Sequence, residues 1–258
     1  MRYFLELAYN GTRFNGWQRQ PNDPSVQQRI EDAFRLILQQ PTLEIVGCGR
    51  TDAGVHAGKY VAHFDFDGVF PKEFLNRANK LVGGDIALQR VAPVSDEAHA
   101  RFDAVLRSYR YNILFKKNPF SQETAWFFPL RTPLDFGKMQ KAAEILLRQS
   151  RNPDSSGRGH SEFAPFCKTH SDAKTMRCDI SKAEWIFSDD GATFEISANR
   201  FLRGMVRLMV GACVNIGLGQ LTLDDLTRAL AAQTPLQKSY SVPPTGLFLT
   251  DVRYPFAF

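Results

Sequence analysis

The residues best suited to chemistry lie in the segment CGRTDAGVH, which runs from Cys48 to His56. It places a carboxylate, Asp52, two positions after Arg50 and between two glycines. The apolar stretch before it and the alternating stretch after it predict two strands, so Asp52 should lie in a short loop at the end of a sheet. Loops held by a rigid sheet commonly carry catalytic groups. Asp and Gly are also favoured in turns, so spacing alone supports a purely structural turn equally well.

A second candidate group is a set of arginines near the C-terminus. Residues 200–217 predict a long helix that is apolar on most sides, with Arg200, Arg203 and Arg207 on one stripe. An arginine on a largely buried helix needs an acidic partner or a polar cleft, because an unpaired buried charge is very costly. The alternative is that these arginines lie at the edge of the surface, and it is stronger for Arg203 than for Arg207.

The first part of the chain alternates between strand and helix patterns. Ser25 and Gln28 resemble a capping box at the start of a helix that Pro41 stops, and Pro71 suits the first position of a second helix. Gly83 and Gly84 should end that helix. Strands are predicted at residues 2–9, 43–48, 59–66 and 86–91. This β-α-β-β-α-β order is the ferredoxin-like one.

The same order recurs after a linker at 93–103. Strands are predicted at 105–115, 179–187, 193–198 and 246–252, and helices at 135–149, 200–217 and 222–232. Thr222 and Asp225 should cap the last helix, and the polar segment 150–162 should be a mobile loop. We therefore predict an α+β fold of two ferredoxin-like (βαββαβ) halves, residues 1–103 and 104–258, with mainly antiparallel sheets that meet at a central cleft.

Composition limits the functional classes. The 258 residues carry a net charge of +5, which favours an anionic partner such as nucleic acid but also suits an ordinary enzyme. The four cysteines are widely spread, which indicates reduced thiols. Cys167, His170 and Cys178 could share a metal, but no second close ligand pair accompanies them. The N-terminus enters a strand directly and no apolar run is long enough to cross a bilayer, so we expect a cytoplasmic protein.

The segment NGTRFNGWQRQPNDP, residues 10–24, combines arginines with Phe14 and Trp17. Such a loop suits RNA, because arginine pairs with phosphate and bases stack on aromatic rings. A surface loop anchored by one buried tryptophan is an equal alternative.

Four separated stretches, which span nearly the whole chain, resemble the TruA-type tRNA pseudouridine synthases. They are YNGTRFNGWQRQ with SVQQRIE, GRTDAGVHA, HARFDAVLRSYRY, and NRFLRGMVRLMVG followed by PPTGLFL. The resemblance implies the pseudouridine synthase fold and the isomerisation of uridine to pseudouridine on the 3′ side of the tRNA anticodon stem and loop. It further implies a homodimer, with no cofactor and no metal.

The same resemblance assigns roles to five positions. It implies that Asp52 is the nucleophile, that Arg207 keeps this carboxylate ionised and oriented, and that Tyr109 stacks on the target base. Arg50 would help to displace the target nucleotide from its stack, and Leu247 would pack on the flipped base. From the residues alone, Tyr109 and Leu247 could equally be core side chains.

One position departs from the family pattern. Gly204 stands where the family pattern predicts histidine, just before Met205, Val206 and Arg207. The departure leaves Asp52 and Arg207 in place, but it could alter local packing or an RNA contact.

The main alternative function is a non-catalytic RNA-binding protein with RRM-like halves, in which Tyr60 and Phe64 would form a stacking surface. A nucleotide-dependent enzyme has no support, because no complete glycine-rich phosphate-binding motif is present. If tRNA is the partner, the positive charge should gather around the cleft, and the candidates are Arg13, Arg19, Arg50, Lys59, Arg107 and Arg158.

Overall fold

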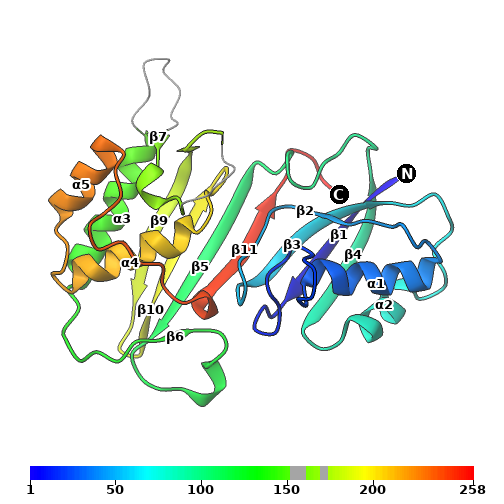
Figure 1. The fold of residues 1–258 in the computed structure, drawn as a ribbon, viewed down its shortest axis with the longest axis horizontal. Helices are drawn as coiled ribbons and strands as arrows, with labels where there is room; N and C mark the ends of the chain where they lie inside the picture. The colour runs from blue at the N-terminus through cyan, green and yellow to red at the C-terminus, as the bar shows by residue number, and fades with distance from the viewer. Residues whose placement is uncertain (152–160, 169–173) are drawn as a thin grey trace. The chain divides into compact units, whose positions relative to one another are not determined.

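The computed structural model describes residues 1–151, 161–168 and 174–258. The chain forms two compact units (Figure 1). Unit 1 contains residues 1–106 and 248–258, and unit 2 contains residues 107–247. The division lies close to the predicted boundary after residue 103, but residues 248–258 belong to the first unit rather than to the second. The described residues have a mixed α/β architecture with mainly antiparallel strand pairing.

The sheet of unit 1 is built around β1 (Arg2–Tyr9). β1 pairs antiparallel with β4 (Ile86–Val94) on one side and with β3 (His56–Asp65) on the other. The short β2 (Val46–Gly47) pairs antiparallel with the distal part of β3, opposite Ala62 and His63. β11 (Leu247–Arg253) pairs in parallel with the first residues of β3. The element order β1-α1-β2-β3-α2-β4 is the predicted one.

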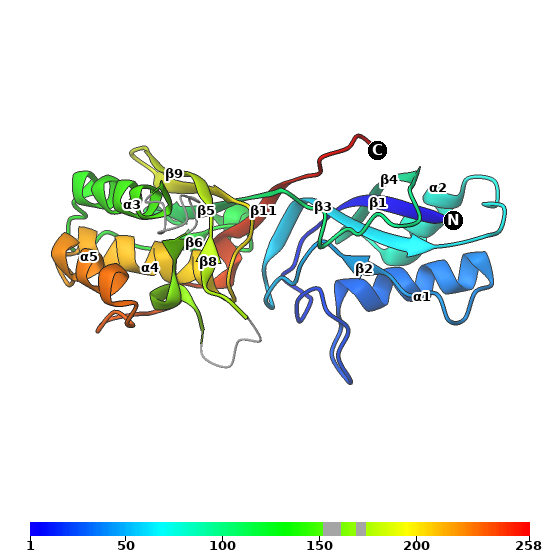
Figure 2. The ribbon, with the colours of Figure 1, turned by 90° about the horizontal axis from the view of Figure 1, so that it is seen from above.

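Helix α1 (Val26–Leu38) lies along one face of this sheet (Figure 2). As predicted, the Ser25 side chain caps it by accepting a hydrogen bond from the Gln28 N–H, and an apolar face is buried. Helix α2 (Phe74–Val82) contacts α1. Its predicted start at Pro71 is wrong: a turn with Glu73 at φ +56° intervenes, and the helix begins at Phe74.

α1 also carries a buried carboxylate, Glu31, whose side chain is 2% exposed. It accepts hydrogen bonds from the Ile45 N–H (3.1 Å) and from the side chains of Gln27 (2.9 Å), Arg19 (3.1 Å) and Arg35 (3.1 Å). Ile45 lies in the segment that leads into β2, and Arg19 follows the 10–17 loop. Glu31 therefore joins α1 to the segment that leads into the Asp52 loop and to the segment that follows residues 10–17.

A buried histidine, His63, lies near the distal end of β3. Its Nδ1 accepts a hydrogen bond from the Ala100 N–H at 3.1 Å, and Tyr254 donates to the carbonyl of Ala100 at 2.6 Å. Burial and the nearby positive charge of Arg2 lower the pKa of His63 to about 4. The connection that follows β4 is thus fixed from both β3 and the C-terminal segment.

The sheet of unit 2 has the order β5-β10-β9, with β5 (Leu106–Leu114), β9 (Ile180–Phe187) and β10 (Gly191–Ala198). β9 and β10 form the predicted antiparallel hairpin. The short β6 (Trp126–Phe127) pairs with β5, and β7 (Ser161–Glu162) with β8 (Arg177–Cys178). Most of the predicted mobile loop, residues 152–160, lies outside the described residues.

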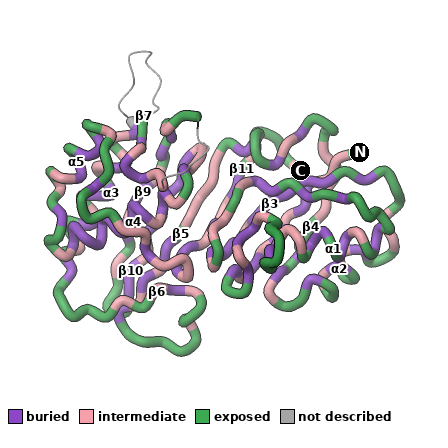
Figure 3. The backbone as a smooth tube through the Cα atoms, viewed as in Figure 1, coloured by how far each residue is buried: buried purple, intermediate pink, exposed green. Residues whose placement is uncertain are grey.

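Three helices complete unit 2. α3 (Phe136–Arg151) packs on β9 and contacts both α4 (Met205–Gly217) and α5 (Leu223–Ala232). The predicted cap of α5 is confirmed, because Thr222 and Asp225 form a reciprocal capping box. α4 is buried along almost its whole length (Figure 3).

Candidate active site

Asp52 lies in the loop that connects β2 to β3. Beyond β2 the pairing with β3 continues only to Cys48, whose N–H donates to the carbonyl of Val61 at 2.8 Å. The following residues leave the sheet, and Gly54, at φ +75°, turns the chain back toward His56. Asp52 is half-buried, whereas Arg50 is exposed. The loop is thus longer than a hairpin turn, and it holds Asp52 part way between core and surface.

Buried aromatic side chains hold the Asp52 loop on its core side. The Tyr9 and Thr51 hydroxyl groups are hydrogen-bonded at 2.9 Å, and the Tyr60 hydroxyl donates to the carbonyl of Gly49. The Trp17 ring stacks on the Tyr60 ring, with centroids 4.1 Å apart and an interplanar angle of 25°. The Gly49 carbonyl and the Thr51 side chain, on the N-terminal side of Asp52, are therefore bonded to buried tyrosines.

The 10–17 loop supports the Asp52 loop through its backbone. The Trp17 N–H donates to the carbonyl of Thr51 at 3.3 Å, and the Gly54 N–H donates to the carbonyl of Phe14 at 3.3 Å. At Gly16, where φ is +84°, a Cβ atom would lie 2.4 Å from the Thr51 oxygen. Only glycine permits the two loops to approach so closely.

The predicted stacking surface of this loop is wrong. Phe14 is 7% and Trp17 is 2% exposed, so both rings belong to the core beneath Asp52. The alternative of a loop anchored by a buried tryptophan is confirmed. The glycines at positions 11 and 16 are the sequence signal for this close backbone packing, because a Cβ at either would collide with the Asp52 loop or with Val55.

His56, at the end of the motif, is buried and has a structural role. Its Nδ1 accepts a hydrogen bond from the Gly11 N–H at 3.1 Å, and its ring stacks on Phe248 at 4.5 Å between centroids. His56 thereby ties the start of β3 to the 10–17 loop and to the C-terminal segment of unit 1.

In unit 2, β5 presents two tyrosines on the same face. Tyr111 is fully buried and donates to the carbonyl of Pro243 at 2.8 Å, and burial raises the pKa of this phenol. Tyr109 is only half-buried, and its ring meets Phe201 edge to face at 5.1 Å. Tyr111 is therefore the core residue, and Tyr109 is the tyrosine with accessible ring surface.

Arg207 is the one residue of α4 that is not buried. Its Nε donates to the carbonyl of Val242 at 2.7 Å, and the Val242 N–H donates back to the carbonyl of Arg207 at 3.3 Å. Because all other α4 positions are buried, the helix has one rotational setting, and Arg207 has a fixed direction. The hydrogen bond from Nε to the Val242 carbonyl also orients the guanidinium group of Arg207.

The predicted arginine stripe is wrong for two of its members. α4 begins at Met205, so Arg200 and Arg203 lie in the preceding irregular segment rather than on the helix. Gly204 precedes the helix with φ +70°, and this left-handed residue breaks the helical path. A Cβ atom at Gly204 would lie 2.8 Å from Cε of Lys168, so the lysine stem covers the position where the family pattern predicts histidine.

Leu247 is 6% exposed at the start of β11. Burial suits the core alternative and leaves its base-packing role a prediction. The structure places Arg50 and Asp52 together in one loop of unit 1. Tyr109, Arg207 and Leu247 all lie in unit 2, where Tyr111 and Arg207 bond to the neighbouring carbonyls of Pro243 and Val242.

The predicted basic residues are largely engaged. Three of them form ion pairs: Arg13 with Asp85 at 3.0 Å, Arg19 with Glu31 at 3.1 Å, and Lys59 with Asp251 at 3.0 Å. Arg107 donates to the carbonyl of Asn199 at 2.9 Å. Arg50 is exposed and, within the described residues, forms no ion pair, and Arg158 lies outside them.

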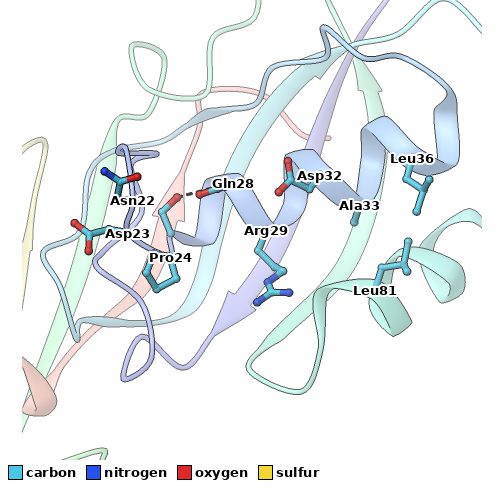
Figure 4. A pocket seen from close by; sticks show the side chains of 10 residues that line it. Asn22, Asp23, Pro24, Gln28, Arg29, Asp32, Ala33, Leu36 and Leu81 are labelled. Carbon is cyan, nitrogen blue, oxygen red and sulfur yellow. Dashed lines mark hydrogen bonds between the residues drawn. The ribbon is translucent and has the colours of Figure 1, made fainter.

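Within the described residues, neither a metal site nor the depression beside α1 adds a group to Asp52 and Arg50. Among the residues that the structure describes, no group of three or more His, Cys, Asp or Glu side chains could hold a metal ion, and His170 lies outside them. A depression beside α1, lined by Asp23, Arg29, Asp32 and neighbouring residues, includes neither Asp52 nor Arg50 (Figure 4). No helix in the described ranges is long and apolar enough to cross a membrane.

Comparisons with known proteins agree with the resemblance of the motifs. A family model described as tRNA pseudouridine synthase matches residues 158–255. The chain is 44% identical to tRNA pseudouridine synthase A of Parabacteroides distasonis, over 98% of this chain and 96% of that protein. It is 42% identical to the protein of the same name from Azobacteroides pseudotrichonymphae, over 98% and 97%. The identity to that from Mesorhizobium japonicum is 36%, over 98% and 99%.

Proposed function

Because the chain belongs to the tRNA pseudouridine synthase family, whose members are isomerases, we propose that it converts uridine to pseudouridine on the 3′ side of the tRNA anticodon stem and loop. The observation that carries the proposal is the 44% identity along almost the whole chain. Because the family consists of enzymes, the alternative of a non-catalytic RNA-binding protein is excluded. Tyr60 and Phe64 are only 0% and 1% exposed, so they offer no stacking surface to RNA.

Asp52 is the proposed nucleophile. The reaction breaks the N1–C1′ bond of uridine, turns the base, and joins C5 to C1′; the proton on C5 leaves and N1 gains one. Asp52 attacks either C1′ of the ribose or C6 of the base, and the covalent bond breaks again in the second half of the reaction. The rigid loop supports this role, because a nucleophile must be held close to its attack geometry.

Arg207 is the proposed partner of the Asp52 carboxylate in the active enzyme. A guanidinium keeps the carboxylate ionised and directs one oxygen toward the substrate. The fixed rotational setting of α4 and the Nε bond to Val242 support this role, since both orient the guanidinium before substrate binds.

Three further residues are proposed to handle the base. Tyr109 stacks on it and takes part in the late proton transfer, which its half-exposed ring supports. Arg50, exposed beside Asp52, fills the place that the target nucleotide vacates in the RNA stack. Leu247 packs on the flipped base. The reaction needs neither cofactor nor metal.

We further propose that each half is ferredoxin-like, that the enzyme is a cytoplasmic homodimer, and that tRNA crosses between the subunits. The order of strands β4, β1, β3 and β2 in unit 1 supports the first point. Sedimentation equilibrium of the purified protein tests the dimer, and a monomer at micromolar concentration would contradict it.

The decisive experiment is incubation with unmodified tRNA, followed by carbodiimide treatment and primer extension to detect pseudouridine. Wild-type enzyme should produce stops on the 3′ side of the anticodon loop, and Asp52→Asn should produce none. Asp32→Asn, which removes an exposed carboxylate from α1, is the matched control and should be active. Product from Asp52→Asn at the wild-type rate would refute the nucleophile assignment.

A further inference from the structure

Unit 2 contains a cavity of about 380 Å³ that includes none of the proposed catalytic residues. Its walls come from the C-terminal end of α4, from Phe128 after β6, and from residues 238–240. The volume lies at the lower end of the range for small-molecule sites. Its lining combines aromatic faces, a buried amide and a cation, which is the set of groups that recognises a nucleotide.

The aromatic walls are Phe128 and Tyr240. Both rings contact Trp126, with centroids 4.8 Å and 6.2 Å from it. The backbone of Tyr240 packs closely against Gly211 of α4, where an added Cβ atom would lie 2.2 Å from the Tyr240 carbonyl oxygen. The two rings are thus held rigidly while remaining partly accessible, as a stacking surface requires.

The buried amide belongs to Asn215, one helical turn after Gly211 on the same face of α4. This side chain is 6% exposed, and its Nδ2 donates to the carbonyl of Lys238 at 2.7 Å. Within the described residues, its Oδ1 accepts no hydrogen bond, although the side chain lines the cavity. Asn215 Oδ1 is not among the fully buried side-chain atoms that lack a partner, so it is open to the cavity and can accept a hydrogen bond from a bound molecule.

Lys238 supplies the cation at the mouth of the cavity. Its side chain is exposed, and no carboxylate in the described part of the chain pairs with it. The Asn215 bond to its carbonyl fixes its backbone beside the amide. An ammonium next to a stacking surface suits a phosphate attached to a stacked base.

We propose that this cavity is a second nucleotide-binding site, separate from the one that holds the target uridine. The base packs on Phe128 and Tyr240 and donates an N–H to the Oδ1 of Asn215, while its phosphate contacts Lys238. The nucleotide is either an unstacked nucleotide of the bound tRNA or a free nucleoside monophosphate. Binding of a free nucleotide goes beyond the proposed function and does not depend on it, whereas binding of a tRNA nucleotide rests on the proposed function.

Calorimetric titration of the purified full-length protein tests the site with AMP, GMP, CMP and UMP, and separately with an anticodon stem-loop RNA. Lys238→Glu should weaken binding about ten-fold, and the uncharged change Phe128→Ala should weaken it to a similar extent. Lys141→Glu reverses another exposed charge of unit 2 and should leave binding unchanged. Asp52→Asn, which should lack turnover, should bind at this site like wild type.

Loss of mononucleotide binding in Lys238→Glu and Phe128→Ala identifies a free nucleotide as the ligand. Loss confined to the stem-loop RNA identifies a nucleotide of the substrate. Unchanged affinity of both variants for both kinds of ligand overturns the proposal. A wild-type protein without pseudouridine activity would refute the proposed function alone, because binding at Lys238 is measured without turnover.

Discussion

Replacing Gly16 with alanine should displace the Asp52 loop without removing any of its groups. The new Cβ would lie 2.4 Å from the carbonyl oxygen of Thr51 and 3.2 Å from the carbonyl carbon of Asp52. Ordinary contact begins at 3.4 Å, and both nearby atoms belong to the backbone, so the loop must shift by about 1 Å. A misplacement of about 1 Å in a nucleophile lowers turnover about 100-fold.

The same substitution also strains residue 16 itself, because its φ is +84°. This strain costs about 1–2 kcal/mol, which lowers the melting temperature by about 2–8 °C. Gly83→Ala is the matched control: Gly83 also has a φ of +84°, but a Cβ added there would have no atom within 4 Å. Gly83→Ala should lose stability through backbone strain alone, Gly16→Ala should also bear the clash with Thr51, and only Gly16→Ala should lose turnover.

The assay is single-turnover pseudouridine formation at saturating enzyme, together with thermal unfolding of each variant. Saturating enzyme separates a slower chemical step from weaker tRNA binding. If folded Gly16→Ala reacts as fast as Gly83→Ala, the close packing of the two loops does not position Asp52, and the structural argument for its rigidity fails.

Glu31→Gln should lower the free energy of unfolding by about 2–3 kcal/mol in urea titrations. The loss is smaller than for a fully buried ion pair, because Arg19 and Arg35 are both partly solvated. Asp32→Asn should change the free energy of unfolding little, and equal losses in the two variants would contradict a stabilising role of the Glu31 hydrogen bonds. The pKa of His63 is lowered to about 4 in the folded protein, so as the pH falls the unfolded chain takes up a proton on His63 before the folded protein does. The free energy of unfolding should therefore be highest above about pH 6.5 and fall by about 3 kcal/mol as the pH drops toward 4. His63→Gln should flatten that slope in urea titrations at pH 7 and 4.5, and an unchanged slope would assign it to other groups. Gly204→Ala should lower the melting temperature, and adding Lys168→Ala should recover only the part due to the 2.8 Å contact, leaving the cost of the positive φ. Full recovery in the double variant would show that backbone strain at this residue is negligible.

Local signals in the sequence predicted local structure well. The caps at Ser25 and Thr222 and the hairpin between β9 and β10 were predicted correctly, because capping side chains and turn residues act within a few positions. The start of α4 was predicted wrongly. Phe201 and Leu202 are apolar and continue the helical pattern, but the structure is irregular there. Only the left-handed backbone of Gly204 ends the pattern, and glycine in a helical sequence is ambiguous.

Burial at the candidate site could not be predicted, because it depends on contacts distant in sequence. Trp17 is a core residue owing to Tyr60, which comes much later in the chain, and His56 is structural owing to Phe248. Asp52 and Arg207 could be identified by motif, but not the aromatic support beneath one or the orienting Val242 carbonyl beside the other. Residues 10–17 carried arginine and aromatic types that suit RNA, and the fold uses the rings for packing instead.

The return of residues 248–258 to unit 1 has a consequence for synthesis on the ribosome. The chain leaves unit 1 at residue 106 and comes back after unit 2, roughly 140 residues later. At ordinary translation rates of about 5–20 residues per second, the nascent first unit waits roughly 7–30 s for its last strand. During that time His56 lacks the ring of Phe248, and the start of β3 lacks its parallel partner. A polypeptide released before residue 248 would therefore carry the complete GRTDAG motif in an unfinished domain.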